Sequence, residues 1–179
     1  MCVCSMENRR YYMITAPFYY IDEARDSIRN FKFYGYFDNG KFLADEMVET
    51  AKCDFDLGEI DFAVPVTLSR ERKRQRGFSQ TDYLTKIIAQ KLSLEYRPDI
   101  LIKYRDTPAQ SELKAKQRKV NLKDAYKIKD GVDLSGKTVL LCDDVKTTGA
   151  TLNECSKMLK KAGVKKIYCL TAAITKNNF

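Results

Sequence analysis

The chain has 179 residues, enough for one well-buried domain and short for two, so we predict a single domain over 1–179. It contains no histidine, which excludes a Ser-His-Asp triad, a Cys-His pair and a His-ligated metal. The net charge of +8 favours an anionic ligand such as diphosphate or nucleic acid. Because the chain shows no long apolar run and no signal pattern, we expect a cytoplasmic protein with no membrane partner.

The first part of the chain predicts an aromatic arm and two amphipathic helices. Residues 1–20 are rich in tyrosine and phenylalanine and predict an extended arm or a hairpin. Apolar residues recur at helical spacing over 20–32. A second helix is predicted from a cap at Asp38 or Asn39 to about residue 53. The buried side of this second helix is predicted to carry Phe42, Leu43, Met47, Val48 and Ala51.

A short strand and a basic loop follow. Residues 60–65 predict the strand, which leads into a basic loop over 66–80. This loop is either a solvated surface or a contact for a diphosphate, because it leaves the carboxyl end of a strand. Ser79 and Asp82 then resemble a capping box, and a helix is predicted from there to about residue 92. The cations of the basic loop are Arg70, Arg72, Lys73, Arg74 and Arg76.

A second strand is predicted over 99–104, and a polar, basic segment with a poor apolar period follows it. We predict a mobile flap over 105–121, which is either a lid over a diphosphate or an ordinary exposed connection. Four cysteines lie in apolar or helical patterns, so we predict buried free thiols. These cysteines are Cys53, Cys142, Cys155 and Cys169.

The motif VLLCDDVKTTGATL, residues 139–152, is the most informative part of the chain. Its first four residues are typical of a buried parallel strand. Asp143 and Asp144 follow at the carboxyl end of that strand, where open α/β sheets bind their ligands. A helical period continues over 152–162, and residues 166–174 predict another buried strand. This βαβ unit predicts a three-layer α/β domain with a mainly parallel sheet.

The side chains of the motif suit a ligand that carries a phosphate and neighbouring hydroxyl groups. A helix N-terminus offers unpaired N–H groups to a phosphate, and Gly149 permits a positive φ. Two adjacent carboxylates suit a ribose diol or a hydrated Mg²⁺. The alternative interpretation is an ordinary strand-end turn followed by a helix cap. The predicted phosphate loop comprises Lys146, Thr147, Thr148, Gly149, Ala150 and Thr151.

This motif resembles the phosphoribosyl-diphosphate (PRPP) motif of type I phosphoribosyltransferases. The resemblance implies that Asp143 and Asp144 hold the ribose hydroxyls and bind Mg²⁺ through its water ligands. It also implies that the loop holds the 5-phosphate of PRPP. The implied reaction transfers the phosphoribosyl group and releases diphosphate.

Two further segments resemble signatures of the ComF subfamily of phosphoribosyltransferase-like proteins. That subfamily shows an arginine before GFNQ, then R-x-T-x-x-Q, then R-x-x-N. The resemblance implies that Arg76, Arg105 and Arg118 face the diphosphate. The chain departs from the pattern at Ser79, which replaces asparagine, and it lacks the N-terminal zinc segment apart from Cys2 and Cys4. The matching residues are Arg76, Gly77, Phe78 and Gln80, then Arg105, Thr107 and Gln110, then Arg118 and Asn121.

The resemblance leaves three functions open. The first is a phosphoribosyltransferase that binds PRPP·Mg²⁺. The second is a non-catalytic accessory of DNA uptake whose basic loops bind single-stranded DNA. The third is a PRPP or nucleotide sensor that binds without turnover. A homodimer is a further partner hypothesis.

Overall fold

The computed structural model describes residues 9–105 and 125–176, and its centre is a six-stranded sheet in which every pair of strands is parallel. The strand order is β1-β8-β7-β3-β4, and β2 also pairs with β8. The two long strands β7 and β8 lie side by side, with Leu141 opposite Cys169. The strands are β1 Met13–Thr15, β2 Phe18–Tyr19, β3 Phe62–Pro65, β4 Glu95–Tyr96, β7 Thr138–Lys146 and β8 Lys166–Ile174.

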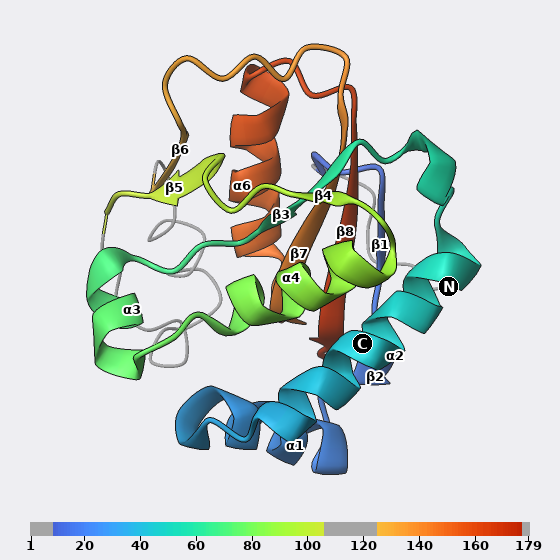
Figure 1. Cartoon of the computed structure of the whole chain (residues 1–179), viewed down its shortest axis with the longest axis vertical. Coiled ribbons are helices and arrows are strands. Elements are labelled where there is room, and N and C mark those ends of the chain that lie inside the picture. The colour runs from blue at the N-terminus through green and yellow to red at the C-terminus, as the bar shows by residue number, and fades with distance from the viewer. Residues whose placement is uncertain (1–8, 106–124, 177–179) are drawn as a thin grey trace.

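Both faces of the sheet are covered, because successive side chains of β7 point to opposite faces. Leu140 and Cys142 join an apolar cluster with α2 and α4. In Figure 1, α4 crosses in front of β7 and β8, and α2 runs past the carboxyl end of β8. Val139 and Leu141 join a second cluster with α6 and with the strands β5 and β6. The predicted three-layer α/β architecture is therefore confirmed. The helices are α1 Asp22–Tyr34, α2 Phe37–Asp54, α4 Gln80–Lys91 and α6 Ala150–Lys161.

The N-terminal part of the chain differs from its prediction in two details. The described part of the arm is extended and adds β1 and β2 to the edge of the sheet, each parallel to β8, so it is not a hairpin. Helix α2 begins at Phe37, so Asp38 lies within its first turn and the predicted cap at that position is wrong. Phe42 is also not buried: it is 50% exposed and stacks on Phe18 at the flank of the helix, with ring centroids 5.9 Å apart.

The predicted basic loop contains a short helix, α3 (Arg70–Arg76), so it is not wholly irregular. The hydroxyl of Ser69 accepts a hydrogen bond from the N–H of Arg72, which caps the helix, and Gly77 ends it with a φ of 76°. Ser79 caps α4 in the same way by accepting from the N–H of Asp82, as predicted. The 3₁₀ turn η1 (Leu57–Glu59) precedes β3.

The strand predicted over 99–104 is β5 (Leu101–Lys103), but it does not extend the main sheet. It pairs antiparallel with β6 (Tyr126–Ile128), a strand that the sequence did not predict. Strand β7 continues to Lys146 because its last residues pair with β8, so the acidic pair lies within the strand and not after it.

Three of the four cysteines that were predicted to be buried are buried and free, namely Cys142, Cys155 and Cys169. Cys53 is free but exposed near the end of α2, so that prediction was wrong. Cys2 and Cys4 lie outside the described residues. Among the described helices, none has the length and apolar character needed to cross a membrane.

Candidate active site

The acidic pair lies near the carboxyl end of β7, and its two side chains point to opposite faces of the sheet. Asp143 lies two residues after Leu141 in the strand, so it points to the same face of the sheet, the one that α6 covers. Asp144 points to the other face, toward α1 and α2. The Oδ1 atom of Asp143 accepts a hydrogen bond of 2.8 Å from the backbone N–H of Asp144. The Oδ2 atom of Asp144 lies 2.5 Å from the Nζ atom of Lys32, which belongs to α1.

The pKa of Asp143 is raised well above the usual value for an aspartate. Burial of the carboxyl group is the largest cause, and the neighbouring charge of Asp144 adds to it. The hydrogen bond from the backbone of Asp144 and the positive charges of Lys32 and Lys103 oppose this rise only in part. A cation that binds near Asp143 would stabilise the ionised form of its carboxyl group.

The predicted phosphate loop lies between this acidic pair and the start of α6. Gly149 precedes the helix with a φ of 74°, a conformation that side chains with a Cβ rarely adopt. A Cβ at this position would lie 3.5 Å from the Cε atom of Lys146 and 3.9 Å from the hydroxyl of Tyr11. The first turn of α6 follows this glycine, and the N–H groups at a helix N-terminus favour an anion.

Hydrogen bonds from flanking residues hold the loop in this conformation. The N–H of Thr175 donates to the carbonyl of Lys146 at 2.9 Å, and the hydroxyl of Thr175 donates to the carbonyl of Thr147 at 3.3 Å. Thr148 is exposed, and its hydroxyl accepts from the N–H of Ala150 at 3.4 Å. Thr151 is partly buried in the first turn of α6. The structure thus brings all six predicted loop residues to the carboxyl end of β7.

The three predicted arginines are not brought together by the described residues. Arg76 ends α3, and its side chain is outside the described part of the structure. Arg105 is exposed just after β5, whereas Arg118 and the rest of the predicted flap lie outside the described residues. Their assignment to the diphosphate therefore stays a prediction. Burial raises the pKa of the Tyr126 phenol well above its ordinary value, and the charge of Arg72, another cation of α3, opposes this rise in part. Arg72 therefore acts on the side of the sheet that Asp143 faces.

Three residues of this site were missed by sequence reasoning. Lys32 is one of several charged residues on an amphipathic helix, and Tyr11 lies in an aromatic arm, so neither carries a local signal. Lys103 is different, because it occupies a buried position of β5, and its ammonium lies 5.5 Å from the ring centroid of Tyr126. A lysine inside an apolar strand was a signal that could have been used.

The acidic pair fits a hard divalent cation. Its oxygen ligands are the kind that Mg²⁺ prefers, and Mg²⁺ is usually held by one or two carboxylates together with phosphate oxygens of the substrate. Burial and the charge of Asp144 raise the pKa of Asp143 although Lys32 and Lys103 lie nearby, so a further cation would stabilise its ionised form. Within the described ranges, 9–105 and 125–176, no group of three or more His, Cys, Asp or Glu side chains gathers.

Sequence comparisons agree with this geometry. Residues 83–178 match the family model for the phosphoribosyl transferase domain. Competence protein F of Haemophilus influenzae is 35% identical over 153 residues, which cover 83% of this chain and 67% of that protein. Competence protein ComFC of Streptococcus pneumoniae is 33% identical over 152 residues, which cover 85% of this chain and 64% of that protein.

The chain belongs to the ComF family of phosphoribosyltransferase-like proteins. Another relative of this ComF-family chain is DNA utilization protein YhgH of Escherichia coli. It is 32% identical over 112 residues, which cover 62% of this chain and 48% of that protein. The ComF-family chain therefore spans about half to two thirds of the length of these curated relatives.

Proposed function

We propose that this ComF-family chain binds PRPP together with Mg²⁺ and transfers the phosphoribosyl group to an acceptor with release of diphosphate. The observation that carries the proposal is the continuous run from β7 into α6. The Asp143–Asp144 pair lies near the end of β7, and the glycine turn at Gly149 that opens α6 follows five residues after Asp144. A carboxylate pair next to a helix N-terminus matches the ribose diol and the 5-phosphate of one ligand.

The chemistry follows from the positions of these groups. The acceptor attacks C1 of the ribose while the bond from C1 to the diphosphate oxygen breaks, and the electron pair leaves with the diphosphate. Asp143 and Asp144 orient the ribose hydroxyls, and the loop over 146–151 holds the 5-phosphate. Mg²⁺, when bound, supplies positive charge to the diphosphate. Arg76, Arg105 and Arg118 are the side chains proposed to bind the departing diphosphate.

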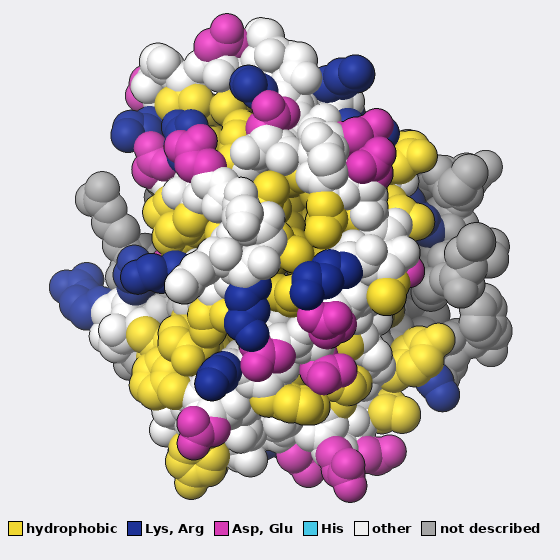
Figure 2. Space-filling view, turned by 45° about the vertical axis from the view of Figure 1, so that its right-hand side comes forward, with side chains coloured by type: hydrophobic (Ala, Val, Ile, Leu, Met, Phe, Trp, Pro, Cys, Tyr) yellow, Lys and Arg dark blue, Asp and Glu magenta, His cyan; other side chains and the backbone are white. Residues whose placement is uncertain are grey.

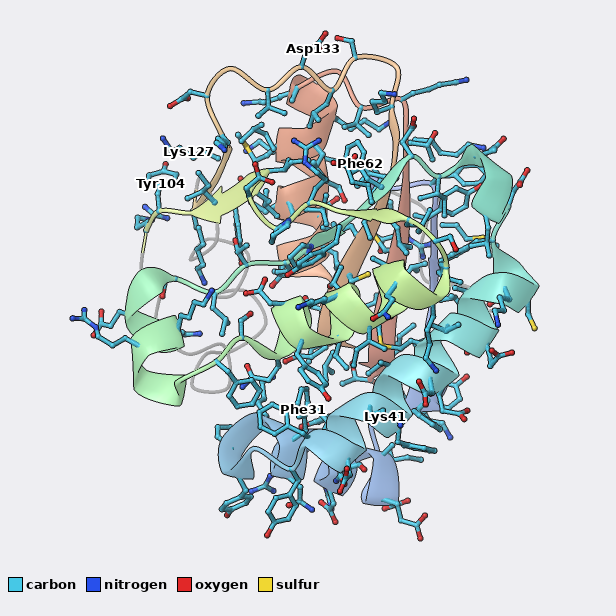
Figure 3. The ribbon with its side chains drawn as sticks, viewed as in Figure 1. Phe31, Lys41, Phe62, Tyr104, Lys127 and Asp133 are labelled. Carbon is cyan, nitrogen blue, oxygen red and sulfur yellow. The ribbon has the colours of Figure 1, made fainter. Side chains whose placement is uncertain are left out.

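Calorimetric titration with PRPP, with Mg²⁺ and then with EDTA, tests the binding step. We expect micromolar binding that requires Mg²⁺. Asp143→Asn and Asp144→Asn should each weaken the binding at least about tenfold, or about 1.4 kcal/mol. Asp133→Asn is the matched control, because Asp133 lies in the loop before β7, far from the site. In Figure 3 it is at the opposite end of the molecule from Phe31, the neighbour in sequence of the Lys32 that contacts Asp144. No heat and no thermal stabilisation at millimolar PRPP would refute the proposal.

Diphosphate release separates the enzyme from the sensor. A protein that binds PRPP·Mg²⁺ and releases diphosphate with at least one acceptor in a screen of bases and amines is a transferase. Binding of PRPP without diphosphate release under any of these conditions favours the third function, a PRPP or nucleotide sensor.

The competence and DNA-utilization names of the relatives favour a second candidate function, the binding of single-stranded DNA. Figure 2 shows basic and acidic side chains interspersed over α2 and α4, whereas Lys73 and Arg74 are exposed on α3. Tyr104, which is 57% exposed, lies on the same side of the molecule as α3 in Figure 3. An aromatic side chain near cations is the arrangement on which unpaired bases stack.

Fluorescence anisotropy with a labelled single-stranded oligonucleotide tests this candidate. The DNA function predicts binding that weakens as salt rises and that is lowered in Tyr104→Ala. It also predicts that Asp143→Asn and Asp144→Asn leave DNA binding unchanged. DNA binding of this kind in a protein that does not bind PRPP would refute our first choice.

A further inference from the structure

The ion pair between Lys32 and Asp144 joins α1 to the central strand of the candidate active site. The Nζ and Oδ2 atoms lie 2.5 Å apart, and the two side chains are only 23% and 17% exposed. At this distance the ammonium occupies one face of the Asp144 carboxylate. Any other cation that binds Oδ2 must approach an atom that already has a positive partner.

The end of α1 that carries Lys32 is held firmly by packing. The preceding residue, Phe31, is 1% exposed, and its ring lies 5.4 to 6.2 Å from the rings of Phe37, Phe78 and Tyr83. Figure 3 shows Phe31 between α1 and the helices α2 and α4, which carry Phe37 and Tyr83. The side-chain amide of Gln80 also donates to the carbonyl of Lys32 at 3.1 Å. The Lys32 backbone is therefore fixed, and only its long side chain can change position.

We propose that Lys32 acts as the counter-ion of Asp144 in the free protein and gives up this place to Mg²⁺ when PRPP·Mg²⁺ binds. The inference rests on the proposed function in taking Mg²⁺ as the incoming cation. Two cations on one carboxylate oxygen repel each other strongly in a partly buried site. The flexible stem of Lys32 lets the ammonium move away while α1 keeps its position. Lys32 is thus a positioning residue that competes with Mg²⁺ for Asp144.

A competitor and a merely structural lysine predict opposite changes in metal affinity. Loss of a structural contact would weaken metal binding or leave it unchanged, whereas removal of a competing cation strengthens it. We expect Lys32→Met to bind Mg²⁺ about tenfold more tightly than the wild type in the absence of PRPP, a change of about 1.4 kcal/mol. Lys32→Arg keeps the positive charge and should bind Mg²⁺ like the wild type.

The measurement is a titration with Mn²⁺ followed by electron paramagnetic resonance of the free ion, with Mg²⁺ as the competitor. Lys41→Met is the matched control, because Lys41 is an exposed lysine of α2 whose side chain points away from Phe31 in Figure 3. Its metal affinity should equal that of the wild type. The effect of Lys32→Met should disappear in an Asp144→Asn background, because the carboxylate over which the two cations compete is then gone.

Unchanged or weaker metal affinity in Lys32→Met, or no detectable metal binding by either protein, overturns the inference. If Lys32→Met does not fold, Lys32→Gln is measured in its place, and circular dichroism confirms the fold of each variant. The outcome is separate from that of the proposed function. Wild type that binds PRPP·Mg²⁺ beside an unchanged Lys32→Met refutes only the inference. Tighter metal binding in Lys32→Met beside wild type that never binds PRPP refutes only the proposed function.

Discussion

Replacing Asp143 by asparagine should make the protein more stable while it removes ligand binding. The carboxylate of Asp143 is partly buried beside Asp144, so its negative charge raises the free energy of the folded state. Asparagine has nearly the same shape, and its side-chain oxygen can still accept the hydrogen bond that the N–H of Asp144 donates. The substitution therefore removes the charge and keeps the contact.

The size and the pH dependence follow from the raised pKa. The folded-state pKa of Asp143 lies above its unfolded value, so the protonated carboxyl group stabilises the wild-type fold relative to the ionised one. This contribution is complete below about pH 4 and is lost as the pH rises through the folded-state pKa. Each pH unit between the two pKa values corresponds to about 1.4 kcal/mol. The pKa of about 8 already includes the charges of Lys32 and Lys103. Because Asp143 is only partly buried and solvent screens part of its charge, we expect Asp143→Asn to be about 1 to 3 kcal/mol more stable at alkaline pH.

Urea unfolding of both proteins at about pH 5.5 and about pH 8.5 measures this difference, which should be larger at the higher pH. Asp61→Asn is the control, because we expect it to change the free energy of unfolding in the opposite direction. The Asp61 carboxylate, next to the amino end of β7, accepts hydrogen bonds from the Thr138 backbone and from Lys137, which lower its pKa. This variant should lose about 1 kcal/mol. An Asp143→Asn protein that is less stable than the wild type at the higher pH would refute the reasoning.

Three other substitutions test the local geometry. Gly149→Ala should cost about 1 to 2 kcal/mol in urea unfolding, because alanine must adopt a φ of 74°, and it should weaken PRPP binding; equal stability would contradict this. Gly40→Ala should lower the melting temperature, because its Cβ would lie 2.5 Å from the Phe31 ring, and a raised melting temperature would show that the ring can move. Ser69→Ala should cost about 1 kcal/mol by removing the cap that accepts from Arg72, and unchanged unfolding would show that α3 needs no cap.

Much of the fold and part of the site could be predicted because their signals are local. The helical period of residues 152–162 and the apolar run over 166–174 correspond to α6 and β8 within a few residues. Asp143, Asp144 and the loop over 146–151 are consecutive in sequence, so a strand that passes into a helix brings them together in whatever domain contains it. Short strands such as β4 and β6 carry too few residues to show a period, and they were missed.

The sequence by itself determined the βαβ unit and the chemistry of its turn, since backbone geometry and neighbouring residues decide both. Only the tertiary structure decided what surrounds that chemistry. Lys32 meets Asp144 because Phe31 packs α1 against α2 and α4, and Tyr11 reaches the loop because the arm pairs with β8. Such contacts depend on the packing of segments that are distant in sequence. The type of a charged or aromatic residue on one segment does not indicate which residue of another segment it will contact.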